Sequence, residues 1–174
     1  MVQDSGYSSK IAHIFDVVEI YGDVPTFIDS IKDVPRSLLI LYAAHFCLSE
    51  VHNGGFLQLF WNATGVLVPQ AVDGFEAMGM PRLAETFTAA ASYLGSPYPQ
   101  SRGDRWDALI EASGRTEDEV TGIFDRAEDL YLAFAEATAT LPFEALDQEA
   151  WELAKSEDGG FQERADAFAA TIAS

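Results

Sequence analysis

Hydrophobic positions recur at helical spacing along almost the whole chain, and no convincing alternation of apolar and polar residues typical of strands is present. Near the N-terminus the pattern predicts a helix over about residues 8–21, ending at Gly22. From residue 35 the chain is apolar on nearly all sides until Asn53-Gly54-Gly55, which predicts a central buried helix over about residues 35–52. We therefore expect an all-α protein.

The remaining periodic segments predict shorter helices around this central one. One short helix is expected after Pro25. Others are expected over about residues 56–62, 68–78, 81–94, 143–155 and 160–173. Residues 95–103, with two prolines and two glycines, are expected to form a loop. Because the helices after this loop keep apolar faces that must pack on something, we place no domain boundary there. The expectation is one compact multi-helix domain over residues 1–174.

The most legible helix is predicted over about residues 117–138. Thr116 and Glu119 have the spacing of a capping box, which marks a helix start. At about 100° per residue, four acids fall within about 20° of one line, opposite an apolar face. These acids are Asp118, Asp125, Asp129 and Glu136, and Glu128 lies to one side of them. They span roughly 27 Å of helix axis. These five carboxylates are the predicted partner-binding face.

The net charge of the chain bears on the role of this acidic face. The 174 residues include 28 Asp and Glu against 10 Lys and Arg, a net charge of −18, while 48% of the residues are hydrophobic. Such a chain is apolar enough to fold as an acidic globule. A negative surface repels phosphate backbones and anionic lipids, so neither direct nucleic-acid binding nor membrane binding is expected. The excess is uneven, with −5 in residues 1–103 and −13 in residues 104–174.

Cysteine usage and hydropathy favour a cytoplasmic location. Cys47 is the only cysteine, which excludes an intramolecular disulfide and suits a reducing compartment. Residues 1–10 are polar and lack the apolar core of a signal peptide. The longest apolar run, residues 38–48, is too short to span a bilayer.

The residues that most often carry enzyme chemistry do not form a recognisable site. His45, Glu50 and His52 are near one another in sequence, but their spacing does not match a zinc site, so we favour structural histidines and expect no metal or cofactor. Cys47 lies in the apolar run, where a thiol is inert. No serine-nucleophile elbow, P-loop or dinucleotide-binding glycine pattern occurs. We therefore expect a protein that is not an enzyme, with no catalytic residues.

The segment from His52 to Asn62 is the third candidate for chemistry. Gly54 and Gly55 permit a positive φ or a close backbone approach, and Gln58 and Asn62 form a polar pair. We favour a helix corner whose amides satisfy backbone groups. The alternative is a small-molecule pocket lined by Gln58, Trp61 and Asn62, which would make the protein a binding or enzymatic domain.

The same segment carries a family resemblance. Its motif residues are Asn53, Gly54, Gly55, Phe56, Gln58, Phe60 and Asn62, preceded by Glu50 and followed by Ala77-Met78-Gly79. This pattern resembles the DNA-mimic protein 19 family, also called domain of unknown function 4375. The resemblance centres on residues 36–95, taken as the core, and weakens over the acidic part, residues 104–174. It gives the motif a structural role.

The resemblance implies an all-helical bacterial protein. In the founding member of the family, carboxylates are displayed in a DNA-like arrangement and bind a transcription factor, displacing it from its operator. We therefore expect a non-enzymatic regulator whose acidic half occupies the basic DNA-binding surface of a protein such as a transcription repressor. Two further alternatives share the charge pattern: an immunity-type inhibitor of a basic nuclease, and an acidic face that serves only solubility or halophilic adaptation.

Overall fold

The structure is a computed structural model that describes residues 6–172, and within that range it contains helices and no strands. The prediction of an all-α single domain is confirmed for these residues; residues 1–5 and 173–174 of the predicted domain lie outside them. The α-helices are α1 (Tyr7–Ile11), α2 (Val24–Ile31), α3 (Arg36–Trp61), α4 (Val68–Ala77), α5 (Pro81–Ala91), α6 (Arg102–Ala112), α7 (Glu117–Asp125), α8 (Leu130–Ala137), α9 (Phe143–Ser156) and α10 (Phe161–Thr171). Short 3₁₀ helices cover Ala12–Asp16, Ala63–Leu67, Ser92–Leu94 and Glu157–Gly159.

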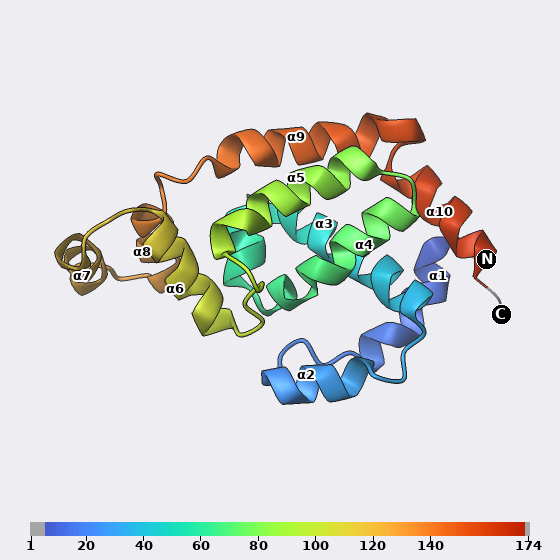
Figure 1. Ribbon diagram of the computed structural model, residues 1–174, viewed down its shortest axis with the longest axis horizontal. Helices are drawn as coiled ribbons and strands as arrows, with labels where there is room; N and C mark the ends of the chain where they lie inside the picture. Colours follow the sequence, from blue (N-terminus) through green and yellow to red (C-terminus); the bar gives the residue numbers. More distant parts are fainter. Residues whose placement is uncertain (1–5, 173–174) are drawn as a thin grey trace.

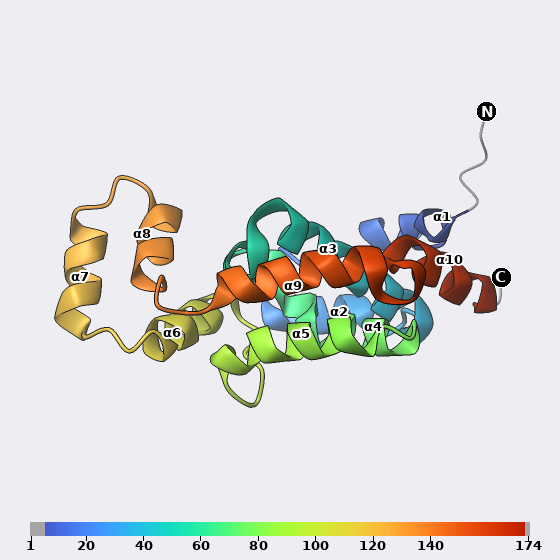
Figure 2. The ribbon, with the colours of Figure 1, turned by 90° about the horizontal axis from the view of Figure 1, so that it is seen from above.

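The central helix is α3. Helices α4 and α9 pack against it, α5 packs against α4 and α9, and together the four form what we call the body (Figures 1 and 2). Leu41, Ala43, Ala44 and Cys47 on α3 are fully buried, which explains why this stretch is apolar on nearly all sides. Although α3 has 26 residues, no helix within residues 6–172 combines the length and the apolar character needed to cross a bilayer.

The predicted helix over residues 8–21 is shorter and changes type. The α-helix ends at Ile11, and a 3₁₀ helix continues from Ala12 to Asp16. Ile11 ends the α-helix and Ile14 lies in the 3₁₀ helix, and both are buried. Because residues three apart lie on the same side of either helix type, apolar spacing alone does not distinguish the two.

The continuous helix predicted over residues 117–138 is wrong. The chain forms α7 and α8, two helices that lie side by side at one end of the molecule (Figure 2) and that we call the acidic hairpin (residues 117–137). Folding back buries Ile123 against Ala133 and Ala137 in a small second core. A straight helix would leave this apolar stripe without a surface to cover it, so burial favours the break.

Candidate partner-binding surface

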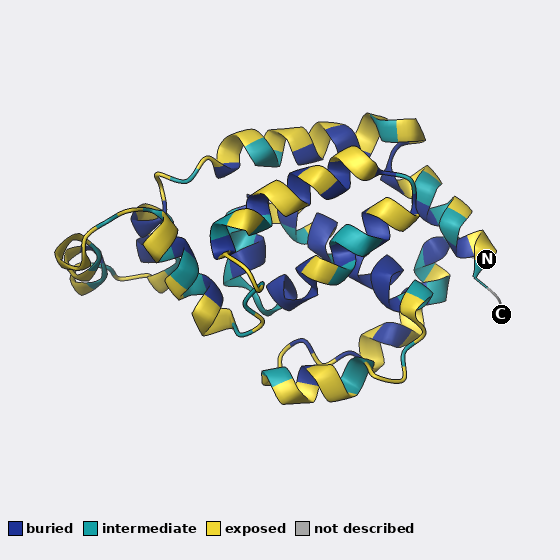
Figure 3. Ribbon diagram, in the orientation of Figure 1, coloured by how far each residue is buried: buried dark blue, intermediate teal, exposed yellow. Residues whose placement is uncertain are grey.

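The break redistributes the five predicted acids. Asp118 lies in the first turn of α7 and Asp125 is its last residue, while Glu128 lies in the turn between the helices. Asp129 is the N-cap of α8, and Glu136 lies in its last turn. The predicted straight row of carboxylates is therefore wrong, although all five side chains belong to exposed residues of the acidic hairpin (Figure 3).

The hairpin brings three of these acids together. Glu128, Asp129 and Glu136 line a hollow of about 330 Å³ between the two helices, and Arg126 lies among them. Asp118 and Asp125 do not line it. The residues that complete the lining are Ile123, Ala127, Leu132 and Ala133.

Two of the five carboxylates already have partners in the chain. Asp129 accepts a hydrogen bond of 3.0 Å from the Leu132 backbone N–H, which caps α8. Glu136 forms an ion pair with Arg126. Asp118, Asp125 and Glu128 form no hydrogen bond or ion pair with residues 6–172 through their side chains. These three are therefore the carboxylates free to meet another molecule.

The rest of the acidic half is equally short of counter-charges. The exposed acids of residues 104–172 are Asp104, Asp107, Glu111, Glu117, Asp118, Glu119, Asp125, Glu128, Asp129, Glu136, Glu144, Glu149, Glu152, Asp158 and Glu163. Within this range Arg126–Glu136 is the only ion pair. Arg105, Arg115 and Arg164 donate to backbone carbonyls, and Lys155 lies over the Trp151 ring at 4.0 Å from its centroid. The negative charge is thus displayed without being neutralised.

The glycine corner has a structural explanation. Gly54 and Gly55 interrupt the helical torsion angles of α3, and Gly55 has φ 75°. A side chain at Gly55 would collide with the carboxylate of Asp147 on α9. That carboxylate accepts a hydrogen bond of 2.7 Å from the Phe56 N–H, so it caps the second helical segment of α3. Burial raises the pKa of Asp147, although the Phe56 hydrogen bond opposes this shift.

The polar pair of the motif binds a carboxylate. Gln58 and Asn62 donate to the same oxygen of Glu50 over 2.9 and 3.0 Å, and Thr64 donates to its other oxygen over 2.9 Å. The expectation that these amides satisfy backbone groups is therefore wrong, because the half-buried Glu50 carboxylate supplies a stronger, charged acceptor. Trp61 stacks on Trp106 with ring centroids 4.1 Å apart. The corner is packed, and the hollows beside α2 and on the hairpin are lined by other residues.

The histidines and the cysteine have structural environments. The Tyr7 hydroxyl and His45 Nδ1 share a hydrogen bond of 3.0 Å, and burial lowers the pKa of His45. His52 packs edge-on against Trp151, and its pKa is lowered by partial burial and by nearby Lys155. Burial raises the pKa of the Cys47 thiol, which keeps it unreactive. Within residues 6–172 no three His, Cys, Asp or Glu side chains are grouped to hold a metal ion.

Sequence reasoning missed α6 and the contacts that it makes. Arg105, only 1% exposed, donates to the carbonyls of Phe60 and Asn62 over 3.3 and 2.9 Å. Trp106 donates to the Trp61 carbonyl over 3.2 Å, so α6 satisfies the carbonyls at the end of α3. The Ser101-x-x-Asp104 spacing marks the start of α6, because Ser101 accepts from the Asp104 N–H.

Comparison with known proteins agrees with the corner motif. The family model described as DMP19-like protein matches residues 32–171, so the chain belongs to the DMP19-like protein family. The match extends through the acidic hairpin and α9. No curated protein and no solved structure matched the chain.

Proposed function

We propose that this member of the DMP19-like family is a non-enzymatic, bacterial DNA mimic that acts in the cytoplasm. Its exposed carboxylates occupy the basic DNA-binding surface of another protein, such as a transcription repressor. The observation that carries the proposal is the acidic half, residues 104–172, which exposes fifteen acids yet contains one ion pair. Arg105, Arg115 and Arg164 donate to backbone carbonyls, so they do not neutralise the exposed carboxylates that would meet a basic partner.

The acidic hairpin is suited to this role because its free acids follow α7 and continue into the turn before α8. Duplex DNA presents two rows of phosphates, at about 3.4 Å of axis per charge on each strand. Asp118 and Asp125, seven residues apart on α7, are separated by roughly 10 Å along the helix. Glu128 continues the charge across the turn to α8. The exposed side of α9 adds Glu144, Glu149 and Glu152 (Figure 3).

Affinity in this arrangement comes from charge complementarity and fast, electrostatically steered association. Exposed charges are screened within about 8 Å at physiological salt, so binding should weaken steeply as salt rises. The exposed Leu130 and Leu132 on α8, 64% and 65% accessible, add apolar area beside the acids.

The test uses two variants with the same change in charge. The first carries Asp118→Asn, Asp125→Asn and Glu128→Gln in the acidic hairpin. The control carries Asp16→Asn, Glu76→Gln and Glu85→Gln, three exposed acids of the first half. Partners captured by immobilised wild-type protein at low salt are purified, and their affinities for both variants and for duplex DNA are measured by fluorescence anisotropy.

We expect the hairpin variant to weaken binding by at least about tenfold, equivalent to about 1.4 kcal/mol, and the control to bind nearly as the wild type does. Duplex DNA should compete with the protein for the partner. The proposal fails if the two variants bind equally well, or if the partner binds DNA and the protein at the same time.

A further inference from the structure

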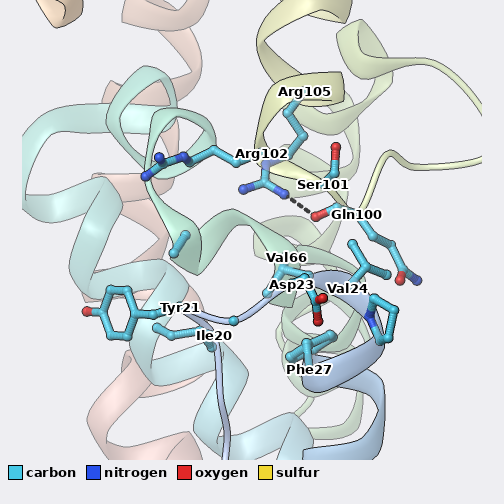
Figure 4. Close-up of a pocket in the computed structure, with 13 residues that line it drawn as sticks. Ile20, Tyr21, Asp23, Val24, Phe27, Val66, Gln100, Ser101, Arg102 and Arg105 are labelled. Carbon is cyan, nitrogen blue, oxygen red and sulfur yellow. Dashed lines mark hydrogen bonds between the residues drawn. The ribbon is translucent and has the colours of Figure 1, made fainter.

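A cavity of about 450 Å³ lies on the opposite side of α3 from α9, where the chain before α2 faces the start of α6 (Figure 4). Its size is that of a small-molecule site. One wall is apolar and comes from Ile20, Val24, Pro25, Phe27, Ala63 and Val66. The other wall is polar and comes from Gln100, Ser101, Arg102 and Arg105. Tyr21, 87% exposed, stands at the rim.

Arg105 is a fixed part of the polar wall. Besides its bonds to α3, it donates to the Gln100 carbonyl over 2.6 Å, the interaction drawn in Figure 4. Three carbonyls thus hold its guanidinium in place while leaving its positive charge without a carboxylate. Burial lowers the pKa of Arg105, but a guanidinium stays charged in proteins.

Arg102 adds a second positive charge to the same wall. Its guanidinium carbon lies 5.0 Å from the centroid of the Trp106 ring, and it forms no ion pair within residues 6–172. Among residues 6–172, Asp23 is the only acid that lines the cavity, and its carboxylate accepts a hydrogen bond of 2.9 Å from the Thr26 N–H at the start of α2. In a chain of net charge −18, this cavity therefore carries a lining charge of +1.

We propose that the cavity binds a small organic monoanion, a carboxylate attached to a flat apolar body. The carboxylate would pair with Arg102, whose guanidinium has no carboxylate partner within residues 6–172. The apolar body would lie against Val24, Phe27 and Val66, with Tyr21 beside it. Asp23 on the facing wall repels a second negative charge, which disfavours phosphate dianions.

The test compares 2-naphthoate with 2-naphthamide, which has nearly the same shape and no charge, by isothermal titration calorimetry on the full chain. We expect the carboxylate to bind at least about tenfold more tightly than the amide, since hydrogen bonds to charged groups are the stronger ones. Arg102→Gln should remove most of this preference. The matched control is Arg82→Gln, an exposed arginine on α5 that does not line the cavity.

Arg105→Gln also removes bonds at the end of α3, so Arg102→Gln and Tyr21→Ala are the decisive variants. Tyr21→Ala should weaken the carboxylate and the amide alike, because it removes apolar contact and no charge. Equal binding of the two ligands, binding unchanged by Arg102→Gln, or tighter binding of inorganic phosphate would each overturn the proposal. The cavity lies apart from the acidic hairpin, so this test is independent of the proposed partner binding.

Discussion

The body and the acidic hairpin are built from the same kind of helix but differ in how much they bury. In the body, Phe56, Phe60, Phe75 and Phe87 are fully buried in one continuous core. The separate core of the hairpin consists of Ile123 with two alanines and a few half-buried neighbours, while Phe134 on α8 is buried in the core of the body. Exposed residues dominate the hairpin in Figure 3, whereas the inner sides of α3, α4 and α5 are buried.

Because of this difference, stability and surface charge are concentrated in different parts of the molecule. Packing a large apolar core supplies most of the free energy of folding, and charged groups do not fit inside it. Apart from Phe134, the hairpin buries few large side chains, so many of its positions are free to carry acids. The surface with the most unpaired charge is therefore also the part with the least packing, and we expect it to open more readily than the body.

The largest expected effect is the loss of stability caused by a substitution in the body core that leaves the hairpin unchanged. Phe60→Ala should lower the free energy of unfolding by about 3–5 kcal/mol, because a fully buried ring is lost and a cavity remains. Ile123→Ala should cost about 2 kcal/mol or less, since its small cluster can relax around the gap. Urea unfolding followed by circular dichroism measures both. Equal losses would show that Ile123 is packed as tightly as Phe60 and would contradict the contrast between the two cores.

A middle-sized effect concerns the cap of α8. Asp129→Ala should destabilise α8 by about 1 kcal/mol, because the Leu132 N–H loses its acceptor. Asp125→Ala is the matched control, since Asp125 has the same charge and caps no helix. Hydrogen exchange should show faster exchange of α8 amides in the first variant only, with the amides of α3 unchanged in both. Faster exchange throughout α3 would contradict the independence of the two regions.

The smallest expected effects are the contributions of two carboxylates to stability, which depend on pH in opposite directions. Hydrogen bonds from Thr116 lower the pKa of Glu119 in the hairpin, so the stability that it contributes is present above its unfolded pKa of 4.5 and is lost as pH falls. Burial raises the pKa of Asp147 in the body above 3.8, so its contribution is present below that pH and is lost as pH rises. Glu119→Gln should remove the loss of stability at low pH that is due to Glu119, and Asp147→Asn should remove the loss at higher pH that is due to Asp147.

The measurement is urea unfolding of the wild type and both variants at several pH values between about 3 and 6. The advantage of the wild type over Glu119→Gln should shrink toward acid, whereas its advantage over Asp147→Asn should shrink toward neutral pH. If the stability difference between wild type and variant changed with pH in the same direction for both variants, the environment assigned to one of the two carboxylates would be wrong.

Local signals account for the parts that the sequence predicts well. Glycine and proline punctuation places α4, α5, α9 and α10 within a few residues of their ends, because these residues restrict or release the backbone wherever they occur. The Thr116–Glu119 capping box is confirmed with both of its hydrogen bonds. Such features depend on neighbours three or four residues apart, so a single chain segment contains all the information.

Features that join distant segments were beyond the sequence. Asp147 and the Phe56 N–H are 91 residues apart, and nothing in the pattern of α9 identifies this one acid as a cap. The apolar stripe of residues 117–138 has the same period whether the helix is straight or folded at residues 126–129. Only the gain from burying Ile123 against α8 decides between the two.

The sequence by itself determined the all-α class, the buried central helix, the family motif and the excess of acids after residue 103, because composition and helical periodicity are properties of the chain. Tertiary structure alone decided which carboxylates are free and which are used. Asp129 caps α8, Glu136 pairs with Arg126, and Glu50 accepts hydrogen bonds from the side-chain amides of the motif. The role of a charge depends on what lies within hydrogen-bonding distance of it, and only folding sets that distance.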